Sequence, residues 1–249
     1  MSVTNGFHRN SRSELLEHEI DLDDLDYSWP EQKKEQERMK VAILAKSTKV
    51  RHDKVTYGYC VAGVNELGEW IRLVADHEGD SLIQADVDKT NLNVGKIFEV
   101  NVIRAPLKHQ SENVVLVDFD FRLTNEDPNQ YVGKLKQLNE VGIFGNLSYF
   151  LTNNDILNPN GTLRIIEVFN LVIYWDKNDK RKARFDYNGV KYEQMSMTDP
   201  KYYTRKGSLE ETSIGSAYIV VSFPEKPWTD GKYYKFVAAI YPKKGNYIF

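Results

Sequence analysis

Two side chains of the segment GEWIRLV could hold a nucleic acid if both lie on the outside of a strand. The alternation of a strand directs Trp70 and Arg72 to one face and Ile71 and Leu73 to the other. The aliphatic pair can then fill a barrel interior, while the indole and the guanidinium remain outside. A ring that stacks on bases beside a cation that meets phosphates is typical of single-strand binding. The alternative is architectural, with the arginine packed across the tryptophan to close a barrel end.

Cations and aromatic rings also follow one another around the first predicted hairpin. Lys46 and Arg51 lie in or beside the loop after the first strand, and Tyr57 and Tyr59 begin the next strand. Such side chains could form an electrostatic groove in which bases stack, provided that the loop faces Arg72. A solvated surface loop is the alternative, because lysine-rich hairpin loops are common on protein surfaces.

The segment HQSEN places an imidazole, a carboxylate and two amides within one short stretch. His109 and its neighbours offer both donors and acceptors, so they could read a base edge or a ribose. The same residues could form a turn in which Ser111 and Asn113 bond the backbone and Glu112 neutralises an arginine. Catalysis by His109 would require a nucleophile or a substrate proton within reach, and the sequence supplies none.

A second basic patch lies in the polar stretch YTRKGSLEETSIGSAY, which contains Lys206. This stretch is long for a hairpin loop, and long loops in small domains are often functional or mobile. Lys206 could therefore extend a binding groove into the second half of the chain. Mobility of the loop explains its composition equally well.

Metal chemistry has one candidate pair, Asp118 and Asp120, which would share a strand face and could hold Mg²⁺ in a metal-dependent nuclease. Arg122 beside them favours an ion-paired outer surface instead. The histidines lack zinc-site spacing, and neither a phosphate-binding loop nor a nucleophile elbow occurs. We therefore expect no catalytic residues, no metal and no cofactor, although an enzyme stays open as an alternative.

The composition is that of an ordinary globular protein, with 41% hydrophobic and 28% charged residues. The chain begins without the apolar region of a signal peptide, and no apolar run is long enough for a membrane span. Cys60 is the single cysteine, which excludes an internal disulfide. These features predict a cytoplasmic protein that does not enter a membrane.

Charge is distributed unevenly along the chain. Residues 1–37 contain 4 basic and 10 acidic side chains, and the remainder contains 29 basic and 26 acidic ones. We expect residues 1–38 to form an acidic, largely flexible extension, because so few apolar residues cannot offset the ordering entropy. Within it, residues 14–29 could instead dock on a partner protein or cover a basic groove by imitating phosphates.

From residue 40 onward, short β-rich runs separated by turn residues predict a mainly β fold. In KVAILAKS we expect Val41, Ile43 and Ala45 on one face. In VVLVDFDFRL we expect a half-buried strand with Val117, Phe119 and Phe121 on its core face. Asn188-Gly189 predicts a tight hairpin turn. One main helix is expected in DPNQYVGKLKQLNEVG, capped by Asp127 and ended by Gly142, and placed between the third and fourth strands of a barrel.

Several segments together resemble the prokaryotic dual OB-containing domain family over about residues 40–243: AILAKSTK, GYCVAG, GEWIRLV, HQSEN, TDPKYY and YYKFVAAIYP. The resemblance implies two OB-like Greek-key barrels packed together, a role in sensing or holding nucleic acid, and an occurrence in bacterial conflict and defence. It implies no catalytic residue set. The expected divisions are the extension 1–38, a first barrel 39–125, and the helix with a second barrel 126–249.

The sequence therefore predicts a non-enzymatic module that binds single-stranded nucleic acid or a nucleotide, as the recognition component of a bacterial defence system. A scaffold that docks a partner enzyme through its acidic extension is one alternative, and a metal-dependent nuclease is another. The predicted ligand-binding residues are Lys46, Arg51, Tyr57, Tyr59, Trp70, Arg72, His109 and Lys206.

Overall fold

The computed structural model describes residues 35–50, 57–136, 138, 140–156, 161–202 and 211–243. Arg51, Lys206 and the proposed docking segment 14–29 lie outside these residues. Strand accounts for most of the regular structure, as the β-rich runs predict. In the part of the chain that is described, no helix has the length and apolar character to cross a membrane.

The first five-stranded barrel is formed by β1 (Gln36–Val50), β2 (Tyr57–Asn65), β3 (Trp70–Val74), β5 (Ile97–Arg104) and β6 (Asn113–Leu116). The sheet runs β1-β2-β3-β6-β5, and β5 pairs again with β1, so the sheet returns to its first strand. Two short strands attach to it: β4 (Leu82–Ile83) pairs with β2 and β7 (Arg122–Leu123) with β5. Helix α1 (Gln84–Val87) follows β4 directly.

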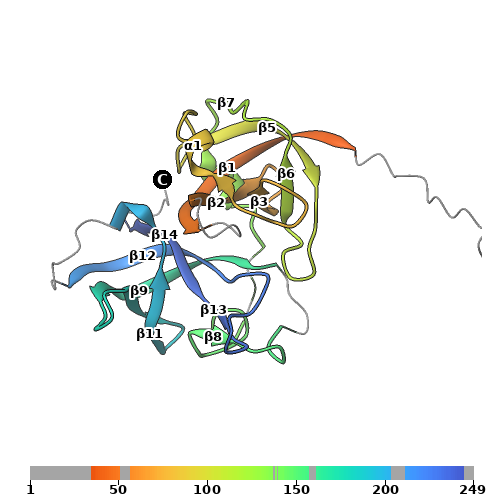
Figure 1. Cartoon of the computed structure of the whole chain (residues 1–249). Coiled ribbons are helices and arrows are strands. Elements are labelled where there is room, and N and C mark those ends of the chain that lie inside the picture. Colours follow the sequence, from red (N-terminus) through yellow and green to blue (C-terminus); the bar gives the residue numbers. More distant parts are fainter. Residues whose placement is uncertain are drawn as a thin grey trace, which may run out of the picture. The chain divides into compact units, whose positions relative to one another are not determined.

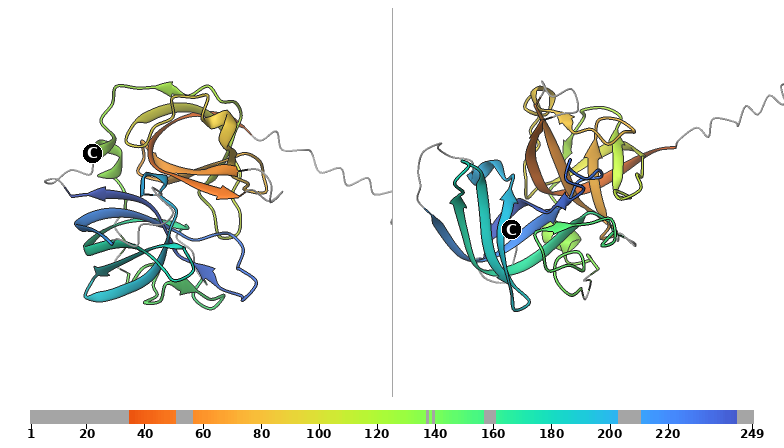
Figure 2. Two further views of the ribbon diagram at one scale, coloured as in Figure 1. Left: turned by 60° about the vertical axis from the view of Figure 1, so that its left-hand side comes forward. Right: turned by 60° about the horizontal axis from the view of Figure 1, so that its bottom comes forward.

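The second barrel is closed and contains β9 (Leu163–Trp175), β10 (Arg181–Tyr187), β11 (Val190–Met197), β12 (Thr212–Ser222) and β14 (Phe236–Pro242). The short 3-10 helix η2 (Pro200–Tyr202) follows β11, and β8 (Phe150–Leu151) pairs with β13 (Tyr233–Tyr234) as a separate two-stranded sheet. The views in Figure 2 show the strands of each half curving around their own interior.

Both barrels have the same connectivity. In each, the third strand pairs in parallel with the fifth, and the fourth strand pairs antiparallel with the first. This is the strand order of the five-stranded Greek-key OB barrel. The predicted fold class, two OB-like barrels in a mainly β chain, is therefore confirmed.

The hairpin between β10 and β11 turns where the sequence predicts it. Tyr187 pairs with Val190, and Asn188 and Gly189 between them have φ angles of 49° and 76°. A two-residue turn with two positive φ angles matches the right-handed twist of its strands, and asparagine and glycine adopt it most readily.

Strand β1 departs from simple alternation. Its register with β2 shifts between Ile43 and Ala45, so a bulge changes the face of the following residues. Val41 and Ile43 enter the core of the first barrel, whereas Ala45 packs with Ala42 and Leu44 in a different cluster. The expected grouping of Ala45 with Val41 and Ile43 is therefore wrong.

The expected strand in VVLVDFDFRL is shorter than predicted. Strand β6 ends at Leu116, and the chain resumes a strand only at Arg122. Phe121 enters the core of the first barrel, but Val117 and Phe119 are exposed. Alternation predicted three buried apolar residues, but only Phe121 finds a neighbouring layer to pack against.

The predicted main helix is also much shorter. Helix α2 covers only Pro128–Val132, and Asp127 caps it as expected by accepting a hydrogen bond from the Asn129 amide at 2.9 Å. It ends at Gly133, not at Gly142, because glycine disfavours helix and few side chains of this segment are buried. It lies between the barrels in the chain, not between two strands of one barrel.

A cluster of small and aliphatic side chains joins the barrels within residues 34–249, which form one compact unit. Leu44 and Ala62 of the first barrel pack with Val220 and Ala239 of the second. The Tyr241 hydroxyl donates a hydrogen bond to the Leu44 carbonyl oxygen. Strand β1 therefore has both faces covered, one by its own barrel and one by the neighbouring barrel.

Gly63 of GYCVAG lies where a side chain does not fit. A Cβ atom there would clash with the Ala42 carbonyl oxygen and come within 2.7 Å of Val41 Cγ1. We expect Gly63→Ala to lower the free energy of unfolding by about 1–3 kcal/mol, since the barrier is backbone that cannot move aside. Urea denaturation checks this, with Gly133→Ala as the control because Gly133 has a helical φ of −63°. Equal midpoints for both variants would contradict the prediction.

Candidate nucleic-acid interface

Arg72 points away from the core of its own barrel but is not exposed, so the expectation that it meets a ligand beside Trp70 is wrong. Its side chain is buried, and the residue is only 7% exposed. The guanidinium donates to Thr162 Oγ1 at 2.7 Å and forms an ion pair with Glu112 at 3.4 Å. The second barrel covers this face of β3, so the cation serves the contact between the barrels. Trp70 is half-buried against the cluster that joins them.

Lys46 and Tyr59 come together, but not as a binding surface. The Lys46 ammonium lies 4.6 Å from the centre of the Tyr59 ring. That ring belongs to the core of the first barrel and is 8% exposed, so it cannot stack on a base as predicted. Burial, followed by a hydrogen bond to Asp88, raises the pKa of Tyr59. Tyr57 is 61% exposed, the only one of these three that is mostly open to solvent.

His109 is buried in the contact between the barrels. Its backbone amide donates to the Glu225 carboxylate at 3.0 Å, and its ring meets Tyr233 edge-on at 5.7 Å. Glu112 in the same segment pairs with an arginine, as the alternative interpretation of HQSEN predicts. A buried His109 is not placed to read a base edge at the surface.

The aspartate pair of the nuclease alternative is already engaged. Asp118 accepts hydrogen bonds from the Asn101 side chain at 2.9 Å and the Asp120 amide at 3.1 Å. Asp120 forms an ion pair with Arg122 at 2.7 Å. Among the described residues, no three or more His, Cys, Asp or Glu side chains are arranged to hold a metal ion.

The predicted binding residues that the structure describes, which exclude Arg51 and Lys206, therefore do not form one concave face. Lys46 lies against Tyr59 of the first barrel core, whereas Arg72 and His109 are buried against the second barrel. Trp70 lines a groove on another side, together with residues of the second barrel. The sequence did not indicate that the second barrel would cover Arg72 and His109.

A cluster of partly exposed rings forms at the β8–β13 sheet of the second barrel, and Figure 1 shows these two strands side by side below β14. Phe150 pairs with Tyr234 across this sheet. We call this cluster the aromatic surface and define it by five residues: Tyr149, Phe150, Trp228, Lys232 and Tyr234.

The rings of the aromatic surface are held in fixed geometry. Tyr149 and Tyr234 stack with 6.0 Å between ring centres and an interplanar angle of 24°. Phe150 and Trp228 each meet Tyr234 edge-on at 6.2 Å. The Lys232 ammonium lies 4.8 Å from the centre of the Phe150 ring. Trp228 is 57% exposed, which leaves its indole available to a ligand.

A tight turn positions Trp228. Its amide donates to the Lys232 carbonyl at 2.8 Å, and the Gly231 amide donates to the Trp228 carbonyl at 2.8 Å. The Tyr234 hydroxyl donates to Asp230 at 2.7 Å, and this hydrogen bond, followed by burial, raises the pKa of Tyr234 to about 12. The phenol therefore stays protonated at neutral pH, and the turn keeps its hydrogen bond.

The outer side of β10 adds cations to the second barrel. Arg184 lies 5.4 Å from the Tyr174 ring centre and forms a two-bond ion pair with Glu211. Lys182 donates to Ser196 at 2.9 Å, and burial lowers its pKa. These cations are engaged by the protein, so they contribute less to phosphate binding than free lysines would.

The aromatic surface was not predicted from the sequence. Its signal is the segment PWTDGKYYK, in which a turn with aspartate and glycine separates a tryptophan from a lysine and two tyrosines. Recognising it requires knowing that Tyr234 turns toward Trp228 while Tyr233 is buried. Residues 149 and 150 are far away in the sequence and reach the surface only through β8.

Two barrels of this connectivity define a dual OB protein, and OB barrels bind oligonucleotides or oligosaccharides through the second and third strands and the loops beside them. The aromatic surface includes the loop between the fourth and fifth strands of the second barrel. A family model described as the dual OB-containing domain matches residues 39–240, and the chain belongs to this family. No curated protein matches the chain.

Proposed function

We propose that this protein is a non-enzymatic, cytoplasmic module that binds single-stranded nucleic acid through the aromatic surface of its second barrel. The observation that carries the proposal is a mostly exposed Trp228 beside the stacked Tyr149 and Tyr234. Lys232 lies over the neighbouring Phe150 ring, and the exposed Lys226 precedes Trp228 by two residues in the chain. The family resemblance supports a further role as the recognition component of a bacterial defence system.

Base stacking is the interaction that this surface is best equipped to make. Every base has an aromatic face, so rings on a rigid turn bind single strands with little sequence preference. Duplex DNA hides these faces within its own stack. We therefore expect a single strand to bind more tightly than a duplex of the same sequence.

Phosphate contacts are few. Lys226 is exposed, whereas Lys232 has an exposed ion pair with Asp230 at 3.4 Å. Two lysine contacts to a single strand predict a slope of roughly −1.4 for the logarithm of affinity against the logarithm of salt concentration. This is a shallower dependence than a continuous basic groove would produce.

Fluorescence anisotropy with labelled single-stranded DNA and RNA tests the proposal. We expect Trp228→Ala to weaken binding by about 5- to 150-fold, the range for loss of one stacked base. Tyr57→Ala is the matched control, because Tyr57 is as exposed as Trp228 but lies on the first barrel. Binding that is lost in Tyr57→Ala and retained in Trp228→Ala would place the site on the first barrel. If the parent protein does not bind either nucleic acid, the alternative of a scaffold that docks a partner enzyme is favoured.

A further inference from the structure

A groove of about 660 Å³ lies beside the start of β3, along the connection after α2 and the outer side of β9 and β12. It is separate from the aromatic surface and shares no residue with it. Its volume is within the range of sites that enclose small organic ligands, roughly 300–1,000 Å³.

Four aromatic side chains line this groove: Trp70, Phe169, Tyr187 and Tyr218. Phe169 is 50% exposed, which leaves a face of its ring open to a ligand. Trp70 packs against the cluster between the barrels. Tyr187 packs against the core of the second barrel, with 6.5 Å between its ring centre and that of Tyr192, so both rings are held by the protein. Rings from both barrels therefore line one groove, and the exposed Phe169 offers a face on which a planar ligand can stack.

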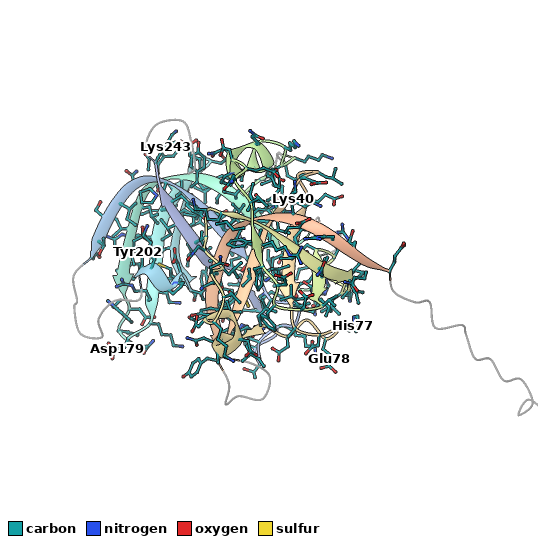
Figure 3. All side chains as sticks on the ribbon, turned by 90° about the horizontal axis from the view of Figure 1, so that it is seen from above. Lys40, His77, Glu78, Asp179, Tyr202 and Lys243 are labelled. Atoms are coloured by element: carbon teal, nitrogen blue, oxygen red, sulfur yellow. The ribbon has the colours of Figure 1, made fainter. Side chains whose placement is uncertain are left out.

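The charges in the groove wall largely cancel. Arg164 pairs with Glu140 at 2.8 Å. Glu167 pairs with Lys243, which is labelled in Figure 3. Lys136 also lines the groove, is exposed, and forms no ion pair with another described residue. Among the described residues that line the groove, Lys136 is the one cation without an ion pair, which suits a ligand with a single anionic group and not a polyanion.

The polar groups of the wall include both donors and acceptors. A guanidinium (Arg164), a carboxylate (Glu140) and an amide (Asn188) line the space between the rings. These are the side-chain types that pair with the edges of nucleobases. Arg164 and Glu140 form an ion pair with each other, so they present a neutral pair to a ligand and not two separate charges.

We infer that this groove binds one mononucleotide unit, with its base among the aromatic rings and its single phosphate at Lys136. The inference is independent of the aromatic surface, because different residues carry it. Such a unit can be a free nucleoside monophosphate or the phosphorylated end of an oligonucleotide, and both present the same chemistry to the groove.

Isothermal titration of the full chain with the four ribonucleoside 5′-monophosphates tests the inference. We expect at least one to bind, Phe169→Ala to weaken it by about fivefold or more, and Lys136→Ala to weaken the monophosphate but not the parent nucleoside. Phe119→Ala is the matched control, an exposed phenylalanine outside the groove. Competition with a 5′-phosphorylated dinucleotide then distinguishes a strand end, which displaces the mononucleotide, from a free nucleotide, which it does not displace.

Failure of all four monophosphates to bind would overturn the inference. So would binding that is unchanged in Phe169→Ala, or a triphosphate that binds more than tenfold tighter than the monophosphate. Mononucleotide binding that is lost in Trp228→Ala but retained in Phe169→Ala would move the ligand to the aromatic surface. That outcome would contradict the groove site but would not contradict the proposed function.

Discussion

Glu112→Ala is expected to lower the free energy of unfolding by about 3–5 kcal/mol, the range for breaking a buried ion pair by removing one partner. The Glu112 side chain accepts from Arg72, from the Thr162 amide at 3.2 Å and from the Thr162 hydroxyl. Its loss leaves the buried guanidinium of Arg72 without a counter-charge. Urea denaturation at pH 7 measures the effect.

Two further variants separate the ion pair from simple loss of packing. Replacing both charges, as Arg72→Met with Glu112→Leu, is expected to recover much of the lost stability, because apolar partners carry no desolvation cost. Glu193→Ala removes an exposed carboxylate that pairs with the exposed Lys191, and we expect a much smaller effect there. An unfolding free energy of Glu112→Ala within about 1 kcal/mol of the parent would contradict this account of the barrel contact.

Lys235 is expected to make the stability of the second barrel depend on pH. Its side chain is fully buried, and its ammonium donates to the carbonyl oxygens of Ile143 at 2.7 Å, Asn146 at 2.8 Å and Ser148 at 2.7 Å. Burial lowers the pKa of Lys235 to about 7, although Asp155 raises it through its charge. The unfolded chain therefore holds this proton up to a higher pH than the folded chain does.

The free energy of unfolding is therefore expected to increase with pH. Between pH 7 and the ordinary lysine range, the unfolded state binds more protons, so the free energy of unfolding rises as pH rises. We expect a gain of about 2 kcal/mol between pH 7 and pH 9, and Lys235→Met should remove this gain. Guanidinium denaturation at both pH values, in parent and variant, measures it. A parent whose stability is flat or falls across this interval would show that the carbonyl contacts outweigh burial.

Local patterns predicted much of the fold. The β10–β11 turn, the cap at Asp127 and the alternating strands depend on residues close together in the chain, where backbone conformation and side-chain direction are decided locally. The bulge in β1 and the early end of α2 were not predictable in the same way. Each depends on which neighbouring layer a side chain finds, and that layer comes from elsewhere in the chain.

The candidate sites also combine features that local sequence predicts with features that depend on distant parts of the chain. Alternation correctly separated Arg72 from Ile71 and Leu73, but an outward direction is not the same as exposure, because the second barrel covers that side of β3. The aromatic surface joins Phe150 to Tyr234, which are distant in sequence and adjacent only after the barrel closes.

The sequence alone therefore determined a mainly β chain, and its resemblance to the dual OB-containing domain family predicted the two OB-like barrels. The tertiary structure decided which aromatic and basic side chains face solvent, because burial depends on the contact between barrels. In the folded chain Arg72 is a buried partner of Glu112, and Trp228 is exposed beside Tyr234. Strand periodicity specifies the two faces of a strand, and only long-range packing specifies which face remains open.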